Sequence, residues 1–97
     1  MILEVAILNV KSGQDTDFEK DFKMAEQYIQ SIKGYIKHSL QKCLEHQNQY
    51  ILLVEWESLE SHTIGFRESE VYLKWKALLH HYYDPFPEVL HYEKLSF

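Results

Sequence analysis

His62 is the residue whose setting in the sequence best suits proton transfer. In the stretch SLESHTIGF, the spacing of Leu59, His62 and Phe66 by three and four residues places all three on one helical face. A neutral imidazole on an apolar face can accept a proton near neutral pH, because histidine titrates near ~6.5 and burial lowers that value. Two interpretations follow, a catalytic base and a core histidine hydrogen-bonded to a backbone carbonyl.

Three other side chains could share a pocket with His62. Trp56 ends an apolar stretch just before this helix, so its indole could wall a pocket or simply fill the core. Arg67 follows the helix, where its guanidinium could hold a substrate oxyanion or carboxylate, or pair with a neighbouring glutamate on the surface. His91 lies near the end of the chain and could face either side of a strand.

The stretch ALLHHYYDPFP holds two adjacent histidines. On a helix over residues 71–83, His80 points away from the apolar face and is expected in solvent. His81 lies on a flank from which its ring could turn inward, so it stays a candidate substrate contact. Because neighbouring helical residues diverge by ~100°, the two rings are not expected to bind one metal. The Asp-Pro pair that follows ends the helix.

Other recognisable chemical motifs are absent from the sequence. There is no HxH or HExxH pattern, no cysteine pair and no glycine-rich phosphate loop. No metal and no cofactor is therefore predicted, although six histidines leave metal binding open. His38 and His46 are expected on a strand surface and in a turn.

Charge and hydropathy limit the possible partners. The net charge is −5 and no run of basic residues occurs, which argues against nucleic acid and anionic membrane surfaces as partners. No apolar run approaches the ~20 residues of a membrane span, and MILEVAILNV lacks the features of a signal peptide. We expect a cytoplasmic protein in which the single cysteine, Cys43, forms no internal disulfide.

Hydrophobic periodicity predicts the elements that must position these side chains. A helix is expected over residues 16–33, with TDFE at its start as a capping box and Gly34 as its C-terminal cap. Ser58 can cap a short helix that ends near Gly65, and a further helix begins near Ser69. The apolar stripe of the first helix comprises Phe18, Phe22, Ala25, Ile29 and Ile32. Strands are expected over residues 2–10, 35–44, 50–56 and 87–95.

The element order β-α-β-β-α-β is that of a ferredoxin-like split βαβ fold, an α+β class with a four-stranded antiparallel sheet and helices on one face. We expect one domain over residues 1–97. The first and third strands are apolar on both faces, so the second sheet face would be left as an exposed apolar patch. This predicts a homodimer packed sheet to sheet; the alternative is a monomer in which Lys and Tyr side chains shield that face.

The sequence resembles the antibiotic biosynthesis monooxygenase (ABM) family over essentially its whole length. The resemblance is carried by YILLVEWESLESHTIGFRESEVYLKWKALLHHYYDPFPEVLHYE, residues 50–93, and by the apolar strand, glycine turn, long helix and KGY before it. It implies a dimeric α+β barrel. Some members of this family oxidise quinol-like or other phenolic substrates with O2 and no cofactor.

By this resemblance, His62 would be the base that removes a phenolic proton. Trp56 and Tyr72 would wall the pocket, and Arg67 or His91 would stabilise anionic oxygen. The partner expected is thus a small aromatic molecule. The alternative is a non-catalytic ligand-binding or stress-response module with the same pocket.

Another branch of the family degrades heme, using an Asn in the first strand, a Trp after the third strand and an axial His on the last helix. The Trp position matches Trp56. Alignment on Gly13 places Ala6 at the Asn position, and the axial position falls at or near Lys76. Asn9 is out of phase by an odd number of residues, and His80 is one helical turn too late. Heme binding or degradation is therefore the least favoured of the three functions.

Overall fold

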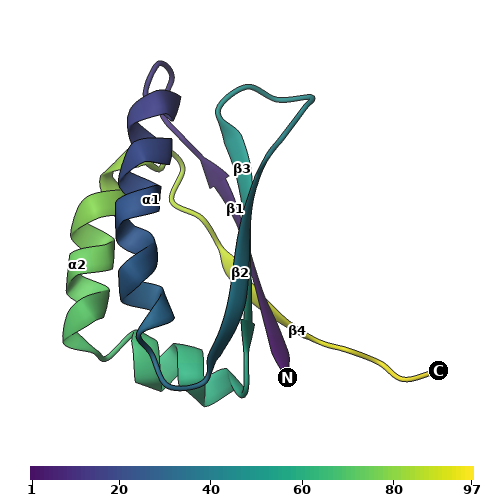
Figure 1. Ribbon diagram of the computed structural model, residues 1–97. Coiled ribbons are helices and arrows are strands. Elements are labelled where there is room, and N and C mark those ends of the chain that lie inside the picture. Colours follow the sequence, from purple (N-terminus) through teal and green to yellow (C-terminus); the bar gives the residue numbers. More distant parts are fainter.

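The computed structural model describes residues 1–97 and has two layers, a sheet and a pair of helices on one of its faces (Figure 1). The sheet is antiparallel with strand order β2-β3-β1-β4, so the predicted ferredoxin-like α+β fold is confirmed. The elements are β1 (Ile2–Asn9), α1 (Asp15–Gln30), β2 (Tyr35–Lys42), β3 (Gln49–Trp56), η1 (Ser61–Phe66), α2 (Glu70–Leu79), η2 (His80–Tyr82) and β4 (Val89–Glu93). No helix is both long and apolar enough to span a bilayer.

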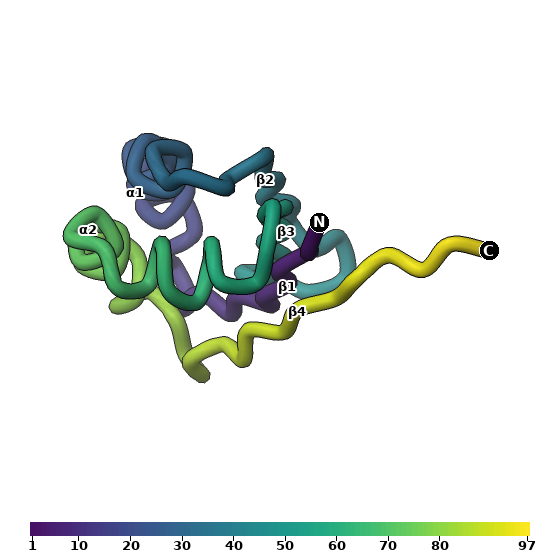
Figure 2. The backbone as a smooth tube through the Cα atoms, turned by 90° about the horizontal axis from the view of Figure 1, so that it is seen from below, coloured from purple at the N-terminus to yellow at the C-terminus, as the bar shows by residue number.

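Figure 2 shows both helices on one side of the sheet. The buried core residues come from these helices and from the inner face of the sheet. Strand residues alternate between the two faces, so every second side chain of β1 and β3 is buried under the helices. The predicted stripe of α1 is buried at Phe18, Phe22, Ala25 and Ile29. Ile32, the last member of that stripe, is half-buried beyond the end of the helix.

The predicted ends of α1 are wrong in two respects. No side chain caps the start of the helix, because the helix begins at Asp15 and the N-cap position falls on Gln14, so Thr16 lies inside the first turn. Glu19 is also engaged elsewhere: its Oε2 accepts from the Tyr50 hydroxyl at 2.5 Å and from Lys42 Nζ at 3.4 Å. The helix stops at Gln30, so Gly34 is not its immediate cap. Gly34 instead takes φ +94° in the turn into β2, where a Cβ would crowd the side chain of Ser61.

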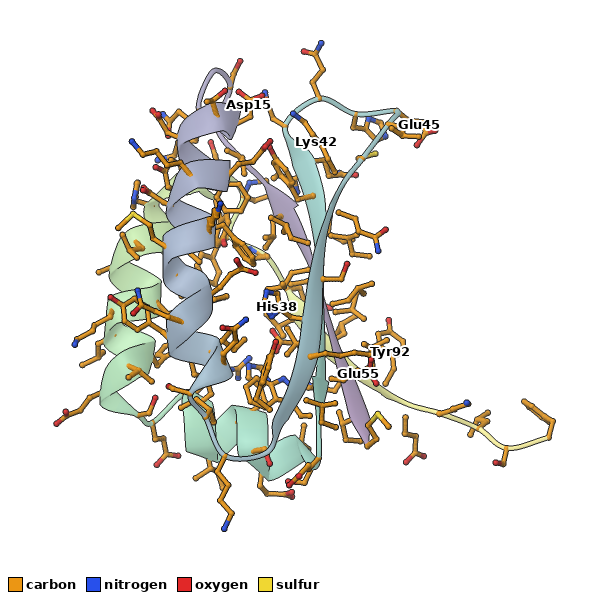
Figure 3. All side chains as sticks on the ribbon, in the orientation of Figure 1. Asp15, His38, Lys42, Glu45, Glu55 and Tyr92 are labelled. Atoms are coloured by element: carbon orange, nitrogen blue, oxygen red, sulfur yellow. The ribbon has the colours of Figure 1, made fainter.

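His38 is not a surface residue, contrary to the prediction. Its side chain is 6% exposed and points from β2 toward α1, where Figure 3 labels it. Its Nε2 lies 2.6 Å from Glu26 Oε2, and its Nδ1 lies 2.5 Å from the Tyr35 hydroxyl. Each ring nitrogen of His38 therefore has a hydrogen-bond partner, as a buried polar group requires. The alternation of side chains along a strand does not by itself predict these partners.

The second face of the sheet is open. Ile7, Leu90 and Tyr92 are 43%, 44% and 52% exposed on this face. Tyr92 and Glu55 project from it, away from the helices, in Figure 3. The chain beyond β4 also extends away from the body of the molecule (Figure 1).

Replacing Gly34 tests how closely the turn before β2 is fitted to η1. We expect Gly34→Ala to lower the free energy of unfolding by more than Gly13→Ala. Both positions have positive φ, +94° and +80°, but only at position 34 would the new Cβ lie 2.7 Å from Ser61 Cβ. Positive φ alone costs an alanine about 1–2 kcal/mol. Urea denaturation measures the free energy of unfolding of both variants. An equal decrease in the two variants would show that the Ser61 side chain moves aside at no cost.

Candidate functional site

η1 is a π-helix, and its wide turns aim His62 and Phe66 into the core. Ser58 Oγ accepts a hydrogen bond from the Ser61 N–H at 3.2 Å, which confirms the predicted cap at the start of this segment. The Arg67 N–H donates to the His62 carbonyl five residues earlier, at 3.1 Å. Leu59, predicted on the same face as His62, is 41% exposed.

His62 is 3% exposed and is held by side chains rather than by a backbone carbonyl. Its ring stacks on the Trp56 indole, with centroids 5.3 Å apart and planes 19° apart. Its Nδ1 lies 2.7 Å from His91 Nε2, and its Nε2 lies 3.4 Å from Glu4 Oε1. The interpretation as a core histidine bonded to a carbonyl is therefore wrong.

Glu4 is the site residue that the sequence analysis missed. It is 5% exposed on the inner face of β1, and its Oε1 accepts a hydrogen bond from Trp56 Nε1–H at 3.0 Å. The strand register brings these groups together, because Glu4 pairs with His91 on β4 and with Val54, two residues before Trp56, on β3. One feature of the sequence could have identified Glu4. It is the single charged residue in the apolar stretch ILEVAILNV, and it lies at one of the alternate positions of β1 that are buried.

A cavity of about 380 Å³ opens beside Glu4 and His62, between the sheet and α2. Part of its wall is a row of side chains on three neighbouring strands, Leu52, Ala6 and Val89. The small side chain of Ala6 leaves space for the cavity. This size suits a small organic molecule. The other lining residues are Leu8, Phe66, Arg67, Tyr72, Trp75, His80, Tyr83, Phe86 and Pro87.

The cavity takes in some of the residues predicted for the site and omits others. His62, Arg67 and Tyr72 line it. Trp56 and His91 lie one layer behind, each in contact with His62. Arg67 is exposed at the rim and forms no salt bridge with Glu68 or Glu70.

The structure reverses the placements expected for the two adjacent histidines. His81 is exposed and does not line the cavity, whereas His80 is half-buried and does. The expectation that His80 faces solvent is wrong because the α-helix stops at Leu79, whose φ of −116° breaks the helical phase before the 3₁₀ turn of η2. The His80 ring lies 5.0 Å from that of Phe86 and 5.9 Å from that of Tyr72.

Burial shifts the pKa values of the titratable groups at the inner site in the direction that favours their neutral forms. Desolvation, followed by the charges of Arg67 and His91, lowers the pKa of His62 to about 3. Desolvation, followed by Lys76, lowers the pKa of His80 to about 4. Desolvation raises the pKa of Glu4, although the Trp56 hydrogen bond and Arg67 oppose that shift. The Arg67 guanidinium at the rim is then the charge best placed to attract a substrate anion.

The sequence profile described as Antibiotic biosynthesis monooxygenase matches residues 1–78. The chain belongs to this family. It is 53% identical over 93 residues to the uncharacterized protein YczJ of Bacillus subtilis (strain 168), covering 96% of this chain and 98% of that protein.

Solved structures of ABM proteins have the same fold. A Bordetella bronchiseptica protein assigned to the family superposes with a TM-score of 0.92 at 28% identity, over 98% of this chain and 97% of that one. SnoaB from Streptomyces nogalater, a cofactor-independent oxygenase, superposes with a TM-score of 0.81 at 17% identity. The superposition covers 99% of this chain and 94% of SnoaB. At that identity, the likeness to SnoaB concerns the fold alone.

The ABM cavity of this protein does not fit a heme site. Ala6, at the Asn position of the heme-degrading branch, presents a methyl group to the cavity, and Lys76, at the axial position, is exposed. Asn9 accepts a hydrogen bond from Gln49 Nε2 at 3.1 Å. His80 is the one cavity histidine near the axial position, but its ring is packed among aromatic rings. No group of three His, Cys, Asp or Glu side chains is placed to hold a metal ion.

The low pKa of His62 predicts a loss of stability in mild acid. The unfolded state binds a proton on His62 below about pH 6.5, whereas the folded state binds it only near pH 3. Between these values the unfolded state holds the extra proton, so the free energy of unfolding falls as pH falls, by about 1.4 kcal/mol per pH unit.

His62→Gln should remove the contribution of His62 to the pH dependence of the free energy of unfolding. The contributions of other titratable groups should remain. We expect the difference in unfolding free energy between wild type and variant to change by about 1.4 kcal/mol per unit between about pH 6 and pH 4. Urea denaturation at several pH values measures it. Parallel pH curves for the two proteins would contradict the assignment of a neutral, buried His62.

Proposed function

We propose that this protein is a monooxygenase that oxidises a small, electron-rich phenol with O2 and without a cofactor. One observation carries the proposal: a buried proton-accepting pair, Glu4 and His62, lines an aromatic-walled cavity with a cationic rim. The ABM family and the fold shared with SnoaB, itself a cofactor-independent oxygenase, support it. Hydroquinones and naphthols are the substrate class of suitable size and chemistry.

The chemistry needs only deprotonation, a dry cavity and O2. Once the phenolic proton has moved to the Glu4–His62 pair, the phenolate is electron-rich enough to reduce O2 itself. Oxygen adds to the ring, the O–O bond breaks, and the products are a quinone and water. For a naphthol, one O2 is consumed, with one oxygen atom kept in the quinone and the other released as water, so the atoms and electrons balance.

The surrounding residues have distinct roles in this proposal. Arg67 at the rim stabilises the phenolate oxygen, and Tyr72 forms an aromatic wall against which a ring can pack. Trp56 stacks on His62 and fixes the plane of its ring. His91 fixes its Nδ1 edge. His81 has no role, because its exposed side chain lies outside the cavity.

A second candidate is a binding module that holds the same class of aromatic molecule without oxidising it. It is favoured by the low pKa of His62, about 3, which makes that imidazole alone a weak base. The two candidates differ in one result, because a binding module is stabilised by the phenol but consumes no O2.

The O2 assay separates these candidates. We expect wild-type protein to consume O2 with a hydroquinone or naphthol, and His62→Gln to lower kcat/KM by about 10²–10⁴-fold, the usual contribution of acid–base catalysis. His46→Gln, in an exposed turn, is the matched control and should keep the wild-type rate. Thermal shifts with the phenols but no O2 uptake would favour the binding module, and full activity in His62→Gln would remove the role of the pair.

The open face of the sheet is proposed as the contact surface of a homodimer. It presents Ile7, Leu90 and Tyr92 to solvent, beside a groove that Leu3 and Glu55 help to line. A second copy packed sheet to sheet would remove this apolar area from water at ~25 cal/mol per Å². This is the assembly expected from the two-faced apolar strands.

Charge placed on the open face should dissociate the dimer. We expect Ile7→Glu and Leu90→Glu to convert a wild-type dimer to a monomer in sedimentation velocity, because each would bury an unpaired carboxylate. Ile64→Glu is the control, since Ile64 is even more exposed, at 53%, but lies on η1. A wild-type monomer, or a dimer unaffected by both sheet variants, would contradict this assembly.

A further inference from the structure

We propose that Glu4 is the residue that takes and returns the substrate proton, and that His62 and His91 form a relay connecting it to the edge of the sheet. This inference rests on the proposed function and assigns the separate roles within its proton-accepting pair. It makes Glu4 a catalytic residue and makes His62 and His91 positioning residues.

The first support is the accessibility of one carboxylate oxygen. Glu4 Oε1 is held by Trp56 Nε1–H at 3.0 Å and faces His62 Nε2 at 3.4 Å. Oε2 has no hydrogen-bond partner, yet every fully buried side-chain nitrogen or oxygen in the protein has one. Oε2 is therefore accessible, and because Glu4 lines the cavity, that oxygen is open to a bound molecule.

The second support is the continuity of the chain of polar atoms. From Glu4 Oε1 it runs to His62 Nε2, through the ring to Nδ1, and across 2.7 Å to His91 Nε2. His62 is buried, whereas His91 is half-buried on β4, an edge strand of the sheet. The chain thus starts in the cavity and ends where water can reach it.

The tautomers of His62 explain how a proton moves along this chain. When Glu4 is protonated, its O–H points to the lone pair on His62 Nε2, and Nδ1–H donates to His91 Nε2. Moving the Glu4 proton to Nε2 while the Nδ1 proton moves to His91 leaves His62 neutral and Glu4 ionised. His91 then releases its extra proton to water. One proton leaves the cavity and no buried imidazolium forms.

The ionised Glu4 then serves every proton step of the reaction. Oε2 takes the phenolic proton, the O–H bond of the substrate breaks, and a carboxylic acid forms. After O2 adds to the ring, Oε2 returns this proton to the outer oxygen of the peroxide, which becomes a hydroperoxide. The ionised Oε2 then removes the proton from the ring carbon that carries the hydroperoxide, the C–H electron pair forms the C=O bond of the quinone, and the O–O bond breaks. The departing hydroxide takes this second proton from Oε2 and leaves as water. Glu4 returns to its ionised form, with Nε2–H of His62 donating to Oε1.

The electrostatic setting is consistent with this division of roles. Burial raises the pKa of Glu4, which makes its carboxylate a stronger base, whereas burial lowers the pKa of His62 to about 3, which makes its imidazole a weaker one. The titratable or charged groups that face Glu4 from the surrounding elements are His62, Arg67, Tyr72, Tyr83 and His91.

Infrared difference spectroscopy tests the proton acceptor without turnover. Binding of 4-nitrophenol, a phenol that ionises readily and absorbs visibly as its anion, should produce the phenolate band and a new carboxylic acid C=O stretch in wild type. Glu4→Gln should lose both, while keeping the Trp56 hydrogen bond through the amide oxygen. Glu88→Gln, an exposed glutamate just before β4, is the control and should behave as wild type.

Turnover with added imidazole tests the relay. We expect Glu4→Gln to lower kcat by about 10²-fold or more, with no rescue. His91→Gln should also be slower, because Glu4 that is protonated when the substrate enters loses its proton to water more slowly without the relay. Imidazole buffer should restore the rate of this variant, because a soluble base replaces the outer end of the relay. His46→Gln should not respond. Thermal melts of each variant verify folding.

The outcomes separate this inference from the function on which it rests. If wild-type protein neither binds 4-nitrophenol nor consumes O2, both fail. If wild type is active and Glu4→Gln keeps its carboxylic acid band or a rate within about threefold of wild type, Glu4 is not the acceptor. If His91→Gln shows no defect or no imidazole rescue, the relay is overturned.

Discussion

The burial of a carboxyl group beside an imidazole in the layer between helices and sheet is the constraint on which this structure depends. Each group would cost several kcal/mol if it were buried without partners. Glu4 and His62 avoid this cost because four elements converge on them: β1 carries the carboxyl, β3 the Trp56 N–H, η1 the imidazole and β4 the His91 ring. The strand register and the π-helical turn at η1 are therefore requirements of the site as well as of the fold.

The rest of the inner layer makes room for a ligand beside that polar pair. Aromatic residues of α1 and α2 fill much of the space between helices and sheet, where the Phe22 ring contacts those of Phe18 and Trp75. The cavity lies where the small side chain of Ala6 faces the helices. A cavity with a polar pair at its inner wall and Arg67 at its rim can bind a planar phenol and separate its proton from its negative charge.

Periodicity in the sequence was sufficient to predict the sheet, the helices and His62, because each of these depends on which face of one element is apolar. To predict Glu4 as a site residue, one must know which strands are neighbours. Only the strand register shows that this glutamate lies beside Trp56 and His91. His80 and His81 were misplaced because Leu79 leaves helical geometry, and no residue type at that position signals the change. The predicted capping box is wrong because the helix begins at Asp15, before Thr16, and Glu19 accepts a hydrogen bond from Tyr50, which is distant in sequence.

The central claim is that O2 is reduced by the bound phenolate itself, and isotope labelling tests it most directly. Metal-stripped protein would be loaded anaerobically with a naphthol and then exposed to ¹⁸O2 for a single turnover, with the quinone analysed by mass spectrometry. The account predicts one ¹⁸O atom per quinone, formed in amounts that match the protein. A quinone without ¹⁸O, or product only after a metal or flavin is added back, would contradict it.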